Sequence, residues 1–239
     1  MLFLKILLIV PSYNEEENVL DNYNEIINYN KNNNTNYDAI VVNDGSSDKT
    51  EEICKQNNIP HITLIHNLGI GGAVQTGYKY ALEHNYDIAV QFDGDGQHDV
   101  NYIKDIIRPI LDNEADMVIG SRFIDKNCSN FKSSFSRRVG INLISFFIKL
   151  VSGKIVLDTT SGFRAVNKDL IKLFSKDYPV EYPEPVSTTN IIKMGYNIKE
   201  IPVNMKARVA GKSSIGSWKN IYYMINVLLS IVLLKKGRK

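Results

Sequence analysis

Cysteine is scarce in this sequence, and no apolar run is long enough to cross a membrane. The 239 residues include two cysteines, Cys54 and Cys128, without C-x-x-C spacing or a histidine in metal-site register. This excludes a disulfide scaffold and is typical of a reduced, cytoplasmic compartment. The longest apolar run near the end, residues 221–234, has 14 residues, whereas a membrane-spanning helix needs about 20. Residues 1–10 contain a lysine and run straight into Pro11, which predicts a buried strand and not a signal peptide.

Acidic residues are missing from two stretches of an otherwise ordinary composition. The chain is 44% hydrophobic and 23% charged, with a formal net charge of +2, which excludes a disordered or collagen-like chain. Residues 126–157 hold six basic and no acidic side chains, and residues 201–239 hold eight basic and none, so the remainder carries −12. This asymmetry predicts that one face of the molecule meets an anionic partner.

Short β-rich apolar runs alternate with helical patterns through the first 92 residues. The expected strands are 4–10, 39–42, 62–65 and 88–92, and the expected helices are 16–29, 49–56 and 72–83. This alternation predicts an α/β fold with a doubly wound, mainly parallel sheet. Ligands bind such sheets beyond the carboxyl ends of the strands. The asparagine-rich residues 28–36 are interpreted as a solvated surface loop.

The second half of the chain is less regular. The expected strands there are 117–120, 161–166 and 197–204, and the expected helix is 186–194. Residues 139–152 and 218–234 each predict a further helix with a narrow polar stripe and an apolar remainder. Since there is no repeat and no linker, we expect one domain over residues 1–216, followed by a helix and a basic tail over residues 217–239.

The segment Asp93-Gly-Asp95-Gly-Gln97 follows an expected strand and carries the most informative chemistry. Alternate residues of an extended chain face the same way, so the two carboxylates and the amide can converge on one point. Oxygen ligands of this kind suit Mg²⁺ or Mn²⁺. A calcium loop is excluded because that pattern needs glycine where His98 stands and glutamate where Lys104 stands. In isolation this segment favours a simple polar turn, whereas the polar segments that follow other strands favour the metal site.

Two further polar segments follow expected strands. Asp44 follows the strand 39–42 and offers a carboxylate to a nucleobase N–H, whereas residues 46–48 are explained by capping of the next helix. The glycine-rich residues 67–73 precede a helix and let the backbone approach a phosphate or a base. They do not form a dinucleotide fingerprint, since Val74 stands at its last position, and Lys206 excludes a Walker-type loop ending at Ser213.

Seven motifs in register resemble those of a family 2 glycosyltransferase, specifically the small subgroup similar to dolichyl-phosphate mannose synthases. The motifs are IVPSYNEE (9–16), NDGSSD (43–48), NLGIGGA (67–73), DGDGQH (93–98), GSRF (120–123), DTTSGFRA (158–165) and RVAGKSS (208–214). The resemblance implies a nucleoside diphosphate sugar donor, one divalent metal, Mn²⁺ or Mg²⁺, and inversion at the anomeric carbon. It also implies a GT-A type fold, with a nucleotide-binding half over residues 1–99 and an acceptor half over residues 100–216.

The resemblance assigns donor and metal contacts residue by residue. A nucleoside pocket is implied for Pro11, Tyr13 and Glu15, with Asp44 on the base. The implied metal ligands are Asp93, Asp95 and Gln97. The remaining donor contacts are Gly71, Gly94, Arg208, Lys212 and Ser213, of which the last three resemble a mobile loop that folds over the diphosphate.

A candidate base is also implied, and with Asp95 it completes the implied catalytic residues. Glu184 lies eleven residues before Gly195, where the family usually carries an acidic residue. The subgroup often reads Pro-Glu-Pro-Glu, but here the last position is Val186, so Glu181 remains the alternative carboxylate. The alternative to a catalytic role is a structural one, in which Glu184 belongs to a rigid turn and begins a helix.

The acceptor decides whether a base is needed. A polyprenyl phosphate is ionised near neutral pH, whereas a sugar hydroxyl needs deprotonation. The resemblance implies that an acceptor phosphate is held by Arg122, by Arg137 or Arg138, and by Arg164. Structural ion pairs are the alternative for each of these arginines.

The leading hypothesis is a metal-dependent, inverting glycosyltransferase that moves a hexose to a lipid-linked acceptor in cell-envelope polysaccharide synthesis, with a UDP-sugar favoured as donor. A polyprenyl-phosphate mannose or glucose synthase using GDP-mannose or UDP-glucose is the alternative, and a non-catalytic sugar-nucleotide-binding protein is a third. A nucleotidyltransferase is disfavoured because residues 11–15 lack its glycine-rich, basic loop. Residues 131–152 and 218–239 are expected to lie peripherally on the anionic inner face of the cytoplasmic membrane, and no nucleic acid partner is expected.

Overall fold

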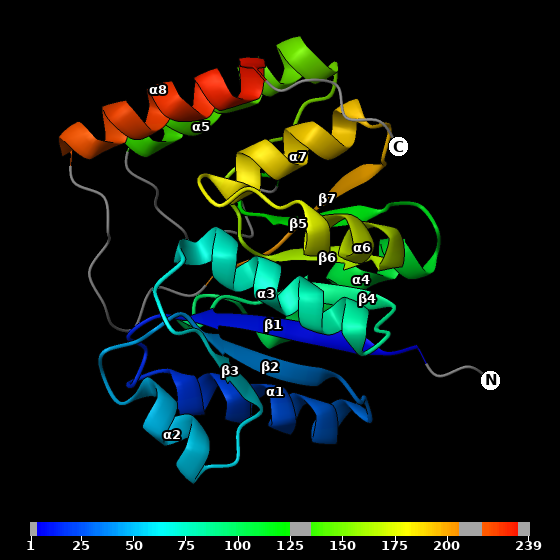
Figure 1. Cartoon of the computed structure of the whole chain (residues 1–239). Helices are drawn as coiled ribbons and strands as arrows, with labels where there is room; N and C mark the ends of the chain where they lie inside the picture. The colour runs from blue at the N-terminus through cyan, green and yellow to red at the C-terminus, as the bar shows by residue number, and fades with distance from the viewer. Residues whose placement is uncertain (1–3, 125–134, 206–216, 234–239) are drawn as a thin grey trace.

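A seven-stranded mixed sheet forms the centre of the molecule, with helices on both faces (Figure 1). The computed structural model describes residues 4–124, 135–205 and 217–233. The strands are β1 (Ile6–Ser12), β2 (Asp38–Asn43), β3 (His61–Thr63), β4 (Ile88–Gln91), β5 (Met117–Ser121), β6 (Arg164–Asn167) and β7 (Ile198–Pro202), in the order β3-β2-β1-β4-β6-β5-β7. Only β6 runs antiparallel to its neighbours. The predicted α/β fold with a mainly parallel sheet is confirmed.

Alternation along the strands divides the buried side chains into two cores. The helices are α1 (Val19–Asn33), α2 (Thr50–Gln56), α3 (Gly69–Glu83), α4 (Ile103–Leu111), α5 (Phe135–Ser152), α6 (Lys168–Lys176), α7 (Pro183–Lys193) and α8 (Ser217–Leu233). Leu8 and Val10 of β1 are buried with residues of α1, α2 and α4. Leu7 and Ile9 are buried on the opposite face with residues of α3, α6 and α7. Because successive strand residues point to opposite faces, one apolar strand serves both layers.

Helices α5 and α8 form an outer layer that packs on α7 (Figure 1). Ile144 and Ile148 of α5 and Val227 and Ile231 of α8 are fully buried in the same core as α7. The helices expected over residues 139–152 and 218–234 are therefore present. Over the part of the chain that the structure describes, no helix has the length and apolar character to cross a membrane.

The loop expected over residues 28–36 is wrong in large part, because α1 continues to Asn33. Ile26 and Tyr29 are buried on the same face of this helix, so apolar side chains hold its asparagine-rich end against the sheet. The helix ends where Asn34 adopts a left-handed conformation with φ of 51°, as is common at helix C-termini. Helices α4 and α6 were not predicted.

The carboxyl ends of three parallel strands meet at one edge of the sheet. Ser12 at the end of β1 pairs with Asn43 at the end of β2. On the other side of β1, Ile9 pairs with Gln91 at the end of β4. The loops that follow these strands are therefore neighbours in space, and the sheet places the predicted polar segments together.

Candidate active site

A cavity of about 480 Å³ opens at the carboxyl ends of β1, β2 and β4 and at the start of α3. Its lining residues are Pro11, Ser12, Tyr13, Glu15, Asp44, Asn67, Gly69, Ile70, Ala73, Asp93, Gly94 and Asp95. Seven of the residues predicted to bind the donor or the metal are among them. Polar segments that are far apart in the sequence thus line one pocket.

Asp44 ties two walls of this cavity together. Its backbone N–H donates to the Ser12 carbonyl at 2.9 Å, and its Oδ1 accepts the Leu68 N–H at 2.7 Å. Burial raises the pKa of the Asp44 carboxyl, although the N–H groups of Leu68 and Gly69 act to lower it. A carboxylate accepts several hydrogen bonds, so the same side chain that orders the loop before α3 can accept a nucleobase N–H.

The loop after β4 places two carboxylates on the cavity. Gly94 fits against the end of β1, since a Cβ there would lie 2.6 Å from the Ser12 Oγ. The Asn22 side chain of α1 donates to the Gly94 carbonyl. Asp95 Oδ1 accepts the Gln97 N–H at 3.1 Å. The loop is therefore held from α1 and β1, while its two aspartates line the cavity.

The donor set fits a divalent metal that is completed by substrate. Within the described residues, no three or more His, Cys, Asp or Glu side chains form a metal-binding group. Asp93 and Asp95 line the same cavity, whereas Gln97 is not among its lining residues. Mg²⁺ and Mn²⁺ at phosphate-transfer sites are commonly held by one or two carboxylates together with substrate phosphates and water. The two aspartates suit that arrangement.

The Asp93 carboxylate has three close neighbours on the protein side. Gln91 Nε2 donates to Asp93 Oδ1 at 3.1 Å, and His98 Nε2 lies 3.5 Å from Asp93 Oδ2. A Cβ at Gly162 would lie 2.4 Å from Asp93 Oδ2, so this space is available only because residue 162 is glycine. Burial lowers the pKa of His98, although the carboxylate of Asp93 acts to raise it, and the ring is neutral at pH 7.

Sequence reasoning gave no role to His98 or to Gln91. The signal for Gln91 is a polar side chain at the end of an apolar strand, and this residue is fully buried. The signal for His98 is its place inside the DGDGQH motif. Only the folded chain shows that the side chains of Gln91 and His98 both lie beside Asp93.

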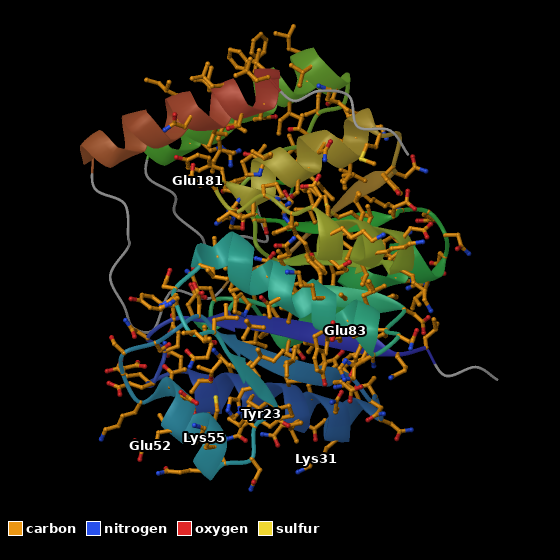
Figure 2. All side chains as sticks on the ribbon, in the orientation of Figure 1. Tyr23, Lys31, Glu52, Lys55, Glu83 and Glu181 are labelled. Carbon is orange, nitrogen blue, oxygen red and sulfur yellow. The ribbon has the colours of Figure 1, made fainter. Side chains whose placement is uncertain are left out.

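Glu184 stands in the first turn of α7, close to the same aspartate. Burial raises the pKa of Glu184 and the nearby Asp93 adds to this effect, while Arg164 and a hydrogen bond from Gln91 lower it. The alternative carboxylate, Glu181, is exposed in the segment just before α7, where Figure 2 labels it. Of the two candidate bases, Glu184 is the one whose pKa is affected by a predicted metal ligand, Asp93.

Two of the predicted acceptor arginines are buried and bonded within the protein. Arg122 Nε and Nη2 each donate to the Asp158 carboxylate at 2.7 Å, so the structural ion pair considered as its alternative is present. Arg164 Nε donates to the Ser161 carbonyl at 2.7 Å, and its Nη1 donates to the Glu184 carbonyl at 2.9 Å. Arg164 therefore holds the first turn of α7.

The other predicted residues are placed as follows. The Arg138 guanidinium lies 3.8 Å from the centre of the Phe123 ring, beside the turn that carries Arg122. Gly71 is not in the cavity lining; a Cβ there would lie 2.3 Å from the Pro179 carbonyl oxygen, so it allows α3 to pack closely. The Arg137 side chain and all of Arg208, Lys212 and Ser213 lie outside the described residues.

Comparison with known proteins identifies the family of this chain. The chain matches the model of glycosyl transferase family 2 over residues 7–174. It is 34% identical to the UDP-N-acetylglucosamine–dolichyl-phosphate N-acetylglucosaminyltransferase of Methanococcus voltae, over 98% of this chain and 97% of the other. The undecaprenyl-phosphate mannosyltransferase of Micrococcus luteus is 26% identical, over 89% and 88%. Glucosyl-3-phosphoglycerate synthase from Mycobacterium tuberculosis, solved with Mn²⁺, UDP-glucose and phosphoglyceric acid, has the same fold, with a TM-score of 0.70 at 17% identity over 98% and 81%. The chain therefore belongs to glycosyl transferase family 2 and is a glycosyltransferase.

Proposed function

We propose that this enzyme transfers a hexose or N-acetylhexosamine from a nucleoside diphosphate sugar to a polyprenyl phosphate, with inversion and with a divalent metal. The observation that carries the proposal is the convergence of Asp44, Asp93 and Asp95 on one cavity. The names of both curated relatives specify a lipid phosphate acceptor. These names favour a polyprenyl phosphate as acceptor over a lipid-linked saccharide. The phosphate acceptor was the alternative hypothesis from the sequence. The first of these relatives also supports a UDP-sugar donor.

Different residues serve the nucleoside and the diphosphate in the proposed reaction. Pro11, Tyr13 and Asp44 bind the nucleoside. Asp93 and Asp95 would hold a divalent metal, Mn²⁺ or Mg²⁺, which would supply positive charge to neutralise the diphosphate. An oxygen of the acceptor phosphate forms the new bond to the anomeric carbon, from the face opposite the diphosphate. The bond from that carbon to the diphosphate oxygen breaks, and the nucleoside diphosphate leaves with the electron pair. An ionised phosphate needs no proton removed before it attacks.

The proposal places the enzyme peripherally on the cytoplasmic face of the membrane, where a polyprenyl phosphate is reached. Helix α5 exposes Val139, Leu143, Phe146 and Leu150, and α8 exposes Ile225, Leu229 and Val232. On each helix these residues recur at intervals of three or four, which puts them on one face. Both helices lie in the acid-free stretches. An apolar face in basic surroundings suits anionic headgroups over a lipid core.

A donor and acceptor screen tests the proposed function. Purified protein with Mn²⁺ is incubated with UDP-N-acetylglucosamine, UDP-glucose or GDP-mannose and a polyprenyl phosphate, and the sugar-bearing lipid is measured. We expect one donor to be used, and Asp95→Ala to lower turnover by about 100-fold or more. The control Asp112→Ala removes an exposed carboxylate at the end of α4 and should leave turnover unchanged. No lipid product with any donor, or full activity of Asp95→Ala, would contradict the proposal.

A further inference from the structure

His98 directs both of its ring nitrogens at a single residue. Its Nδ1 accepts the backbone N–H of Asp93 at 2.9 Å. Its Nε2 lies 3.5 Å from Oδ2 of the same aspartate. Because an accepting Nδ1 carries no proton, the neutral ring has its proton on Nε2, facing the carboxylate. The imidazole therefore contacts the first residue of the DGDGQH motif through both its main chain and its side chain.

Aromatic rings on two elements fix the plane of this imidazole. His98 stacks on Phe163 with ring centres 4.8 Å apart and an angle of 23°. Phe92 meets the imidazole edge-on at 5.6 Å and 74°. Phe92 directly precedes Asp93, and Phe163 directly follows Gly162, whose missing Cβ leaves room for the Asp93 carboxylate. The same two segments thus orient the ring and shape the space for the carboxylate.

An ordinary buried core histidine satisfies its nitrogens with whichever groups lie nearby. Here the side chain is only 2% exposed, and both nitrogens are spent on a predicted metal ligand. Gln91 adds a second constraint, since its Nε2 donates to Asp93 Oδ1 at 3.1 Å. Gln91 therefore holds one oxygen of the carboxylate by a hydrogen bond, while the imidazole Nε2 lies beside the other.

We propose that His98 is a positioning residue for the metal site, which sets the orientation of the Asp93 carboxylate through its two ring nitrogens. This inference rests on the metal dependence in the proposed function. Hydrogen-bond partners of ligating carboxylates fix ligand geometry, and their loss typically weakens metal binding by about 10- to 100-fold. His98 acts only through Asp93 and has no contact with substrate in this role.

Three substitutions separate the two contacts. His98→Leu removes both nitrogens but keeps an apolar side chain in the aromatic surroundings. His98→Asn keeps an oxygen near the place of Nδ1, and His98→Gln keeps an N–H near the place of Nε2. His84→Leu is the matched control, because His84 is an exposed imidazole that also stacks on an aromatic ring, Tyr80, at 3.9 Å.

The readout is Mn²⁺ binding, measured by electron paramagnetic resonance on the full chain with saturating UDP or GDP, together with the melting temperature without metal. We expect His98→Leu to weaken Mn²⁺ binding by about 10- to 100-fold, with His98→Asn and His98→Gln between it and the wild type. His84→Leu should bind Mn²⁺ like the wild type. If His98→Leu does not fold, the Asn and Gln variants decide the matter.

Two results would overturn the inference, and they are distinguishable. If the wild type binds Mn²⁺ and the folded His98 variants bind it equally well, the positioning role fails while the metal-dependent function stands. If the wild type binds no Mn²⁺ with either nucleotide, the metal part of the proposed function fails and the positioning role fails with it. A melting temperature that falls in every His98 variant with unchanged Mn²⁺ affinity indicates a purely structural histidine.

Discussion

Glu184 has the environment of a catalytic base, but the acceptor determines whether one is used. Burial raises the pKa of its carboxyl, which brings the group nearer to the operating pH, where a general base is effective. Arg164 fixes the backbone beside it through the Glu184 carbonyl. A hydroxyl acceptor would exploit this base, whereas an ionised phosphate acceptor would not. One substitution therefore distinguishes the two acceptor chemistries.

Glu184→Gln should leave kcat with a polyprenyl phosphate acceptor within about threefold of the wild type, because no proton has to be removed. With a lipid-linked saccharide whose nucleophile is a hydroxyl, loss of a general base costs about 100- to 10,000-fold. The measurement is kcat for both acceptors with the same donor. Glu181→Gln, which changes an exposed carboxylate of the same segment, serves as the control and should match the wild type with both. A large loss with the phosphate acceptor would assign Glu184 another role.

The candidate site was predictable from sequence wherever a polar residue directly follows an apolar strand. Asp44 and Asp93 are of this kind, because strand order alone brings the ends of β1, β2 and β4 together. The roles of the arginines were not predictable, because an ion pair depends on segments that meet only in the fold. Arg122 finds its carboxylate 36 positions along the chain at Asp158. The aromatic stack on His98 likewise depends on Phe163, which lies in another segment.

At the scale of elements, apolar periodicity predicted most of the helices, but the periodic pattern of α4 was overlooked. Helix α4 buries Ile103, Ile106, Ile107 and Ile110, a helical spacing that the sequence already contains. Composition misled the interpretation of α1, since asparagine content suggested a loop over residues 28–36, where the helix instead continues past the buried Tyr29 to Asn33. Helices α5 and α8 carry more apolar residues than packing requires, because each has apolar side chains both toward α7 and toward the exterior. The exterior set is not needed for packing, which makes it available to a membrane.

The exposed face of α5 should govern association with lipid. Phe146 and Leu150 are 59% and 68% exposed, so Phe146→Ser with Leu150→Ser removes apolar surface that packs little against the protein. We expect sedimentation with phosphatidylglycerol vesicles to show binding weaker by at least about tenfold, with an unchanged melting temperature. Leu111→Ser, at an exposed leucine of α4 on the other side of the sheet, is the control. Equal vesicle binding by the double variant and the wild type would exclude α5 from the membrane contact.

At the scale of the whole molecule, folding buries ionisable groups in the cores on both sides of the sheet. Burial raises the pKa of the Cys54 thiol to about 11 and that of Tyr37 to about 12. On the opposite side, burial raises the pKa of Tyr78 and Tyr178 above the ordinary value of 10.0. All four groups are neutral in the folded protein at pH 7. Stability therefore depends on conditions that keep them protonated.

The sign of this dependence makes the enzyme alkali-labile. A group whose pKa is higher in the folded than in the unfolded state contributes stability that is complete below the unfolded pKa and is lost as the pH rises toward the folded pKa. The free energy of unfolding should therefore be level from pH 6 to 8, as far as these groups govern it, and fall above about pH 9. Each group that is ionised only in the unfolded state contributes about 1.4 kcal/mol per pH unit. Tyr37→Phe keeps the ring against Tyr29 and removes one such group, so urea unfolding followed by circular dichroism should show a shallower decline between pH 10 and 12. The difference in free energy of unfolding between the wild type and Tyr37→Phe should stay constant from pH 6 to 8. Identical slopes of the two proteins above pH 10 would show that folding does not raise the pKa of the Tyr37 hydroxyl.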